Sequence, residues 1–173
     1  KKKEVVMAKK QKINNVWVFK GETYEPSYEE LEDLGYYGFI YLIEDKEKSV
    51  YYVGEKSFHS FRTPKGKQNK KRQESNWRLY PSSNGVLSLR IKKYEGDHNE
   101  RFKFNILALC SDKAIMKAEE CRWMFLLKAL FSDNFLNDNI HINILRSYKD
   151  YDKRVNSVDM SEYVGLVKEC ING

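Results

Sequence analysis

At 173 residues the chain is long enough for one hydrophobic core and too short for two. It is 41% apolar, 14% aromatic and 32% charged, which is typical of a folded protein, and no apolar run approaches the roughly 18 residues of a membrane-spanning helix. Residues 1–12 carry a net charge of +5 and residues 62–78 carry +6, whereas the remaining 144 residues carry −5. Two basic segments on an acidic body predict an anionic partner, although a solvated tail and a solubilising loop would give the same charges.

Nucleic acid is the favoured anion. A membrane surface fits less well, because neither basic segment has an amphipathic apolar stripe, and no membrane partner is expected. The three cysteines, Cys110, Cys121 and Cys170, form no C-x-x-C pair. An odd number of cysteines without framework spacing is typical of reduced thiols, so we expect a cytoplasmic protein.

The N-terminal part predicts a basic arm followed by a short β element and a short helix. Residues 1–15 are polar and lysine-rich, and residues 16–24 are β-prone but broken at Gly21. Ser27 is followed three residues later by Glu30, which predicts a capping box and a helix that ends at about Leu34.

A β-hairpin is predicted next. Residues 37–43 and 50–54 are rich in aromatic and β-branched types, and a charged turn separates them. Residues 57–62 are predicted to be a short helix. The polar stretch 63–76, with its lysines and glycine, predicts a loop that becomes ordered on binding.

The C-terminal half predicts two helices and a third strand. Val86, Leu87 and Ile91 recur at helical spacing before Gly96, and residues 102–110 alternate as a strand does. Ser111 and Asp112 predict the start of a long helix that runs to about Ser132. A last strand is expected over 140–145 and a weak helix over 163–171. The order predicts an α+β fold, with a three-stranded antiparallel sheet flanked by helices.

Several kinds of site are excluded by spacing. His59, His98 and His141 lie in three separate elements without the spacing of a zinc site. No P-loop, Rossmann fingerprint or nucleophile elbow is present.

The remaining features resemble the GIY-YIG nuclease family. Gly38-Phe39-Ile40-Tyr41 and Tyr52-Val53-Gly54 stand for the two motifs, and Arg62 follows Gly54 by eight residues. Glu120 lies on the predicted long helix, and Asn137 lies beyond it. The pattern is similar to that of a group of phage endonucleases, through Tyr37–Tyr41, Tyr52–Ser57, Trp77–Ser83 and Leu109-Cys110. The resemblance covers roughly residues 16–146.

The resemblance implies a site for phosphodiester hydrolysis. Tyr41 would be the general base or would align the water, with Tyr52 beside it. Arg62 and Lys56 would favour the phenolate form, and Arg62 would also grip the scissile phosphate. Glu120 would bind Mg²⁺ or Mn²⁺, and its neighbour Glu119, about 100° away around the helix, would be solvated. Asn137 would support the site, a role that Asn134 or Asn139 could also take. Candidate contacts to double-stranded DNA are Lys65, Lys67, Lys70, Lys71, Arg72, Trp77 and Arg78, although Trp77 fits core packing equally well.

The sequence therefore predicts a metal-dependent DNA endonuclease domain over 16–146, with a basic insertion at 63–76 and an extension at 147–173. Its location would be the host cytoplasm if a phage encodes it. Specificity would be low, or supplied by the basic loop or by a homodimer. The alternative is a nucleic-acid-binding module of the same fold that has lost turnover. Phe39, at the usual first glycine position, and Glu55, where the relatives carry lysine, favour that alternative.

Overall fold

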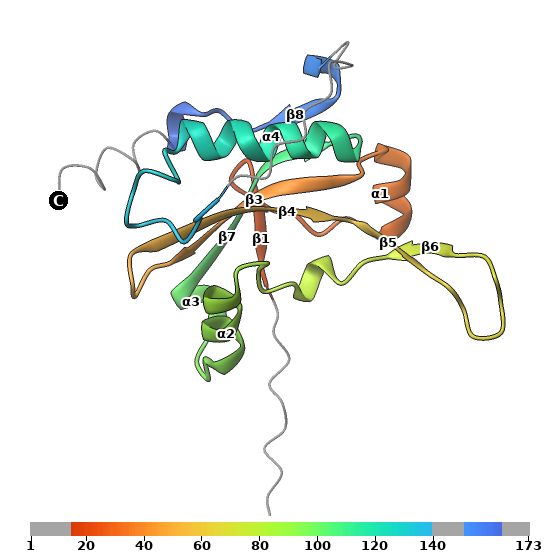
Figure 1. Ribbon diagram of the computed structural model, residues 1–173, viewed down its shortest axis with the longest axis horizontal. Coiled ribbons are helices and arrows are strands. Elements are labelled where there is room, and N and C mark those ends of the chain that lie inside the picture. Colours follow the sequence, from red (N-terminus) through yellow and green to blue (C-terminus); the bar gives the residue numbers. More distant parts are fainter. Residues whose placement is uncertain (1–14, 140–150, 164–173) are drawn as a thin grey trace, which may run out of the picture.

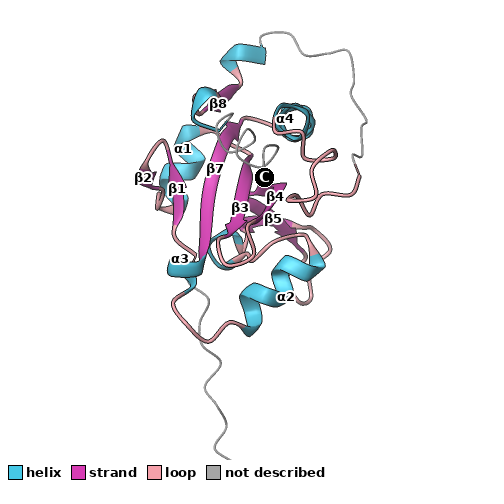
Figure 2. Cartoon of the chain, turned by 90° about the vertical axis from the view of Figure 1, so that its left-hand side faces the viewer, coloured by secondary structure: helices cyan, strands magenta, loops and turns pink. Residues whose placement is uncertain are grey.

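The computed structural model describes residues 15–139 and 151–163. A mixed sheet forms its centre, with strands in the order β2-β1-β7-β3-β4. The three long strands β3 (Gly38–Asp45), β4 (Val50–Ser57) and β7 (Phe102–Cys110) pair antiparallel. The predicted α+β fold with its three-stranded antiparallel sheet and flanking helices is thus confirmed, and Figure 2 shows these strands side by side.

Three short strands, β1, β2 and β8, bring the main sheet to six strands. The N-terminal strand β1 (Trp17–Phe19) pairs parallel with β7, and β2 (Glu22–Thr23) folds back on it across a turn at Gly21. The last strand, β8 (Val155–Ser157), pairs antiparallel with the other end of β7. Its polar residues carry no alternating pattern, so sequence alone did not reveal it.

Both faces of the sheet are covered, because alternate residues of the long strands are apolar on both sides. Helix α4 (Lys113–Leu126) packs on one face, and α2 (Gly85–Lys93) with the 3₁₀ turn η1 (Trp77–Leu79) packs on the other (Figure 1). The α4 face contains Ile40, Leu42 and Val53, and the α2 face contains Phe39, Tyr41 and Ile43. Tyr41 therefore belongs to the face that α2 covers.

The remaining helical elements are short. Helix α1 (Tyr28–Leu34) begins with the predicted capping box of Ser27 and Glu30 and ends at Gly35, which has a φ of 70°. Helix α3 (His98–Arg101) leads directly into β7, and the 3₁₀ turn η2 (Tyr151–Lys153) precedes β8. None of the helices in the described residues is both long and apolar enough to cross a membrane.

Two predictions for this region were wrong: residues 57–62 do not form a helix, and residues 63–76 are not a loop throughout. Strand β5 (His59–Arg62) pairs antiparallel with β6 (Lys71–Glu74) to form a separate two-stranded ribbon. Figure 1 shows this ribbon projecting beyond the end of the main sheet. Cross-strand pairing between distant segments, which short local patterns do not reveal, overrides the helical tendency here.

The long helix is also shorter than predicted, because α4 ends at Leu126 rather than near Ser132. Lys128 adopts a φ of 51°, and its N–H bonds to the Phe125 carbonyl while the N–H of Ala129 bonds to the Met124 carbonyl. This is a Schellman C-cap motif with lysine in place of the usual glycine. The sequence therefore contained no glycine signal for the end of the helix. The strand expected over 140–145 lies outside the described residues, as does most of the helix expected over 163–171.

Candidate active site

Tyr41 and Tyr52 lie together on the α2 face of the sheet. Tyr41 is paired across the hairpin with Gly54, and Tyr52 lies two residues before that glycine. Because side chains two residues apart in a strand share a face, the two rings meet, with centroids 6.2 Å apart. A Cβ atom at Gly54 would lie 2.5 Å from the Tyr41 hydroxyl oxygen and 2.9 Å from the Tyr52 ring, so only glycine leaves room for this arrangement.

Gly54→Ala is therefore expected to lower the free energy of unfolding by about 1–3 kcal/mol, the usual cost of overpacking. The matched control is Gly85→Ala at the start of α2, where a Cβ would meet nothing within 4 Å. Urea denaturation of the two variants measures the difference. Equal stabilities would show that Tyr41 can move aside without cost.

Ser83 joins the two tyrosines. Its Oγ lies 2.8 Å from the Tyr52 hydroxyl and 3.2 Å from the Tyr41 hydroxyl, and its backbone N–H donates to the Tyr41 oxygen at 3.3 Å. Ser83 precedes Asn84, which caps α2 by accepting from the Leu87 N–H. The start of α2 thus fixes the position of the hydroxyl group that links the two phenols.

A lysine and a third tyrosine complete this side of the site. Lys56 points to the same face as Tyr52, its ammonium lies 4.2 Å from the Tyr80 ring centroid, and it donates to the Asn76 side chain at 2.8 Å. Burial lowers the pKa of Lys56. The structure therefore brings the predicted Lys56 to the tyrosines as a cation that is partly removed from water.

The phenols are held in their neutral form. Burial raises the pKa of Tyr41 well above 10, and it also raises the pKa of Tyr52, to which the Glu120 carboxylate adds a smaller contribution. The expectation that nearby cations favour phenolate is therefore wrong for the described chain. A neutral phenol can still align a water molecule or pass a proton through its hydrogen bonds.

Glu120, on α4, lies near β4, the last strand in the order of the main sheet. It shares one ammonium with Glu55 of β4, since Lys117 Nζ lies 2.7 Å from Glu55 and 3.5 Å from Glu120. Burial, and then the nearby Glu55 charge, raises the pKa of Glu120. Two carboxylates thus converge at this edge and are balanced by one lysine.

This pair is chemically suited to a divalent metal ion. Mg²⁺ binds through one or two carboxylates together with water and substrate phosphates, and the second Glu55 oxygen is buried without a hydrogen-bond partner. Within residues 15–139 and 151–163, no group of three or more His, Cys, Asp or Glu side chains could hold a metal. Among the described side chains of these four types, Glu55 and Glu120 would therefore be the ligands, and an ion would need to displace Lys117.

Asn137 is bonded to the backbone of β4 beside the site. Its side-chain amide donates to the Val53 carbonyl at 2.8 Å and accepts from the Val53 N–H at 2.9 Å, as a neighbouring strand would. The preceding Leu136 N–H bonds to Tyr51 at 2.8 Å. Asn137 therefore fixes the backbone of the second motif, and Asn134 joins β4 only through its backbone carbonyl.

The predicted role of Glu119 was wrong. It is fully buried, with Arg122 at 3.4 Å and no hydrogen bond to either carboxylate oxygen. Ile115, Glu119 and Trp123 recur every four residues on the core side of α4, which puts Glu119 inside and turns Glu120 toward the β4 edge.

Three further predicted residues have their own surroundings in the fold. Arg62 is exposed at the end of β5, and in the described residues no hydrogen bond, ion pair or ring contact joins it to Tyr41 or Tyr52. Trp77 is fully buried against Phe39 and Phe58, which rules out stacking on a base. Arg78 binds Glu74 and the Pro26 carbonyl.

The lysines at 65, 67 and 70 are exposed in the turn between β5 and β6, and Lys71 and Arg72 lie on β6.

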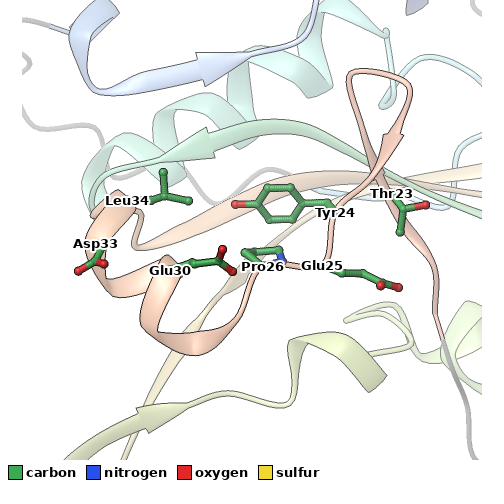
Figure 3. A pocket seen from close by; sticks show the side chains of 7 residues that line it. All are labelled: Thr23, Tyr24, Glu25, Pro26, Glu30, Asp33 and Leu34. Atoms are coloured by element: carbon green, nitrogen blue, oxygen red, sulfur yellow. The ribbon is translucent and has the colours of Figure 1, made fainter.

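A separate pocket of about 560 Å³ opens beside α1 (Figure 3). Its lining includes Glu25, Glu30 and Asp33 and shares no residue with the tyrosine site. Three carboxylates repel phosphate, so this pocket does not suit a nucleic acid backbone.

Sequence reasoning missed two members of the site. Ser83 was visible only as part of a Trp-x-x-Tyr-x-Ser-Ser pattern, which did not say that its hydroxyl would reach both tyrosines. Lys117 lies three residues before Glu120, a spacing that places both on neighbouring positions of one helix face. That spacing could have identified it.

Most of the chain matches a known protein family. Residues 17–140 match the family described as "Putative endonuclease segE, GIY-YIG domain". No curated protein and no solved structure matches the chain. The match spans most of the sequence, including the tyrosine hairpin, Ser83 and Glu120. The chain therefore belongs to the GIY-YIG nuclease family.

Proposed function

We propose that this chain is a divalent-metal-dependent endonuclease that hydrolyses phosphodiester bonds in double-stranded DNA. The proposal rests on two unlike groups at β4 that lie close enough for the Glu120 carboxylate to raise the pKa of Tyr52. One is the pair of tyrosine hydroxyls joined by Ser83, and the other is the pair of carboxylates Glu55 and Glu120. Family membership supports nuclease chemistry for this arrangement.

The burial of the two tyrosines separates their roles. Tyr52 is partly exposed, so its hydroxyl can hydrogen-bond the attacking water, whereas Tyr41 is fully buried and acts through Ser83. Ser83 can pass a hydrogen bond between them because a hydroxyl group both donates and accepts. Tyr52 is thus the catalytic tyrosine of the proposal, and Tyr41 is a positioning residue.

Glu120, with Glu55 beside it, would hold Mg²⁺ or Mn²⁺. A bound divalent ion would polarise the phosphate and stabilise the departing oxygen. Lys56 lies on the tyrosine side of β4, where its ammonium can attract the same phosphate. Lys117 neutralises the carboxylates in the absence of an ion, which keeps two like charges at one edge tolerable.

Direct metal binding tests this assignment without cleavage. Lys117→Met removes the competing ammonium and should tighten Mn²⁺ binding on the order of tenfold, whereas Glu55→Gln should weaken it. Lys113→Met, on the same helix, is the matched control and should leave the Mn²⁺ affinity unchanged. Electron paramagnetic resonance of free Mn²⁺ measures all three variants. Unchanged affinity in Lys117→Met would show that the ion does not use this pair.

A second candidate function is a nucleic-acid-binding module without turnover. The Lys117 ammonium between the two carboxylates favours it, because a permanent ion pair would exclude a metal. Supercoiled plasmid incubated with the protein in Mg²⁺ or in EDTA separates the two functions. Nicking in Mg²⁺ alone supports the enzyme. Retention of the plasmid without nicking in Mg²⁺ or Mn²⁺ supports the binding module.

A further inference from the structure

Two pockets near α1 share Tyr24 and Glu25 as lining residues. The larger has a volume of about 560 Å³ and lies between β2 and α1 (Figure 3). The smaller has a volume of about 290 Å³, and its lining includes Asn15 and the buried rings of Trp17 and Trp77. Because two residues line both pockets, the pockets adjoin. Together they have the size of a site for a small organic molecule.

Two hydrogen-bonding groups in these pockets have no partner within the described residues. Asn15 is only 6% exposed, and its amide nitrogen donates to the Tyr80 carbonyl at 2.6 Å, whereas its Oδ1 is buried and unpaired. The Tyr24 hydroxyl is also buried without a partner, and Figure 3 shows it directed toward α1. Burial raises the pKa of Tyr24 to about 12, so this hydroxyl stays neutral and can accept a hydrogen bond. Buried acceptors without a partner are costly, and a ligand with donor groups would satisfy them.

Three carboxylates surround the larger pocket. Glu25, Glu30 and Asp33 are exposed and form no ion pair within the part of the chain that the structure describes, although Glu30 also accepts a backbone hydrogen bond at the start of α1. Figure 3 shows Glu25 and Asp33 on opposite sides of the pocket. Arg78 lines the smaller pocket, but its guanidinium is already paired with Glu74 at 3.0 Å. The two pockets together therefore attract a cation.

The spread of the carboxylates decides between a metal ion and an organic cation. Residues 15–139 and 151–163 contain no group of three or more His, Cys, Asp or Glu side chains that could hold a metal, so these carboxylates do not converge on one point. Pro26, Leu34 and the Tyr24 ring add apolar surface to the same pocket. The fitting ligand is therefore a cation whose charges are separated by an apolar chain.

We propose that the two pockets bind one linear aliphatic polyamine, with one ammonium group near Asn15 and Glu25 and another near Glu30 and Asp33. An ammonium group has up to three donors, so a single group can serve Asn15 Oδ1 and the Glu25 carboxylate together. The methylene groups between the charges would pack on the Tyr24 ring, whose face also attracts a cation. This site requires neither a bound metal nor DNA, so its test is independent of the proposed nuclease function.

Calorimetric titration of the full chain with spermidine, in EDTA and without DNA, tests the proposal. The wild type should bind spermidine at a single saturable site. Glu25→Gln/Asp33→Asn should weaken this binding by at least about tenfold, because it removes two exposed carboxylates without changing their shape.

The matched control is Glu22→Gln/Glu29→Gln. These two glutamates are exposed on β2 and α1 and line neither pocket, so the control removes the same net charge from the same side of the molecule. Its affinity for spermidine should stay within about twofold of the wild type, since charges in water interact weakly. Equal weakening in the two double variants would reduce the effect to general attraction by an acidic surface and would overturn the proposal.

Tyr24→Phe tests the buried hydroxyl without disturbing the fold. The hydroxyl has no partner within the described residues, so its removal breaks no internal hydrogen bond and the variant should melt at or above the wild-type temperature. Its affinity for spermidine should fall by about tenfold. A variant that melts like the wild type and binds spermidine equally well would contradict the proposed site.

Two further ligands define the chemistry of the occupant. Putrescine, which has two ammonium groups, should bind about tenfold or more tightly than butylamine, which has one, because the second group acts as a tethered ligand. Equal affinities would show that only one end of the site is used and would overturn the two-ended arrangement. A peptide with two lysines that binds tightly while spermidine does not would assign the pockets to a basic protein segment instead.

Discussion

Tyr52→Phe is expected to slow the cleavage of bound DNA by about 10²- to 10⁴-fold, the usual contribution of a positioned proton-transfer group. The substitution removes one oxygen atom, which lies 2.8 Å from Ser83, and leaves the ring in place. Tyr41→Phe should slow cleavage less, because the Tyr41 hydroxyl is buried and acts through Ser83. It should also cost about 1 kcal/mol of stability, since the Ser83 N–H loses its acceptor.

Single-turnover rates at saturating DNA measure these effects, with Tyr51→Phe as the control. Tyr51 neighbours Tyr52 in β4 but points to the α4 face, so its substitution should leave the rate of bound complex unchanged. A larger loss for Tyr41→Phe than for Tyr52→Phe would reverse the two assigned roles.

The pH dependence follows from the same site. Because burial raises the pKa of both tyrosines above 10, no rise in rate from phenolate formation is expected between about pH 6 and 9. The proposed activity needs the ionised Glu120 carboxylate. The raised pKa of Glu120 means that activity should fall at a higher pH than an ordinary carboxylate would give as the solution is acidified. Single-turnover rates of the wild type across this range would show a phenolate contribution as a steady increase toward high pH.

Glu120→Gln is expected to reduce metal-dependent cleavage by at least about 10²- to 10³-fold, since a metal ligand supports several kcal/mol of charge stabilisation. DNA binding should persist, because the ribbon is a separate element. The matched control is Glu119→Gln, the same change one residue earlier. It lies inside the α4 face and should keep the cleavage rate of folded protein.

Both variants should be at least as stable as the wild type near neutral pH. Burial raises the folded-state pKa of Glu119 and Glu120, so the folded chain binds protons more tightly than the unfolded chain does. Stability from such a group is present at low pH and is lost as the pH rises from its unfolded pKa through its folded pKa. A neutral glutamine removes that loss. An equal loss of cleavage in Glu119→Gln and Glu120→Gln would contradict the assignment of Glu120 as the metal ligand.

The central sheet and the tyrosine pair could be predicted because their patterns are local. The strand Phe102–Cys110 matched its predicted bounds, and the capping box of Ser27 and Glu30 is present. Each of these patterns lies within ten residues, where alternation or capping chemistry determines the backbone conformation.

The rest of the fold depends on distant pairings. The β5–β6 ribbon needs residues 59 and 74 to meet, and the end of α4 uses a lysine in a conformation that favours glycine. Ser83 reaches Tyr41 across 42 residues, and no spacing rule connects them. The ionisation of the tyrosines depends on burial, which only the folded chain shows.

The most direct test of the proposed activity measures binding and cleavage in the same reaction. A labelled duplex is mixed with excess wild-type protein, and the bound and cleaved fractions are followed as Mg²⁺ or Mn²⁺ is added. We predict that binding is already present in EDTA and that cleavage of the bound duplex appears and saturates with the metal. Complete binding without cleavage at any concentration of either metal would contradict the account.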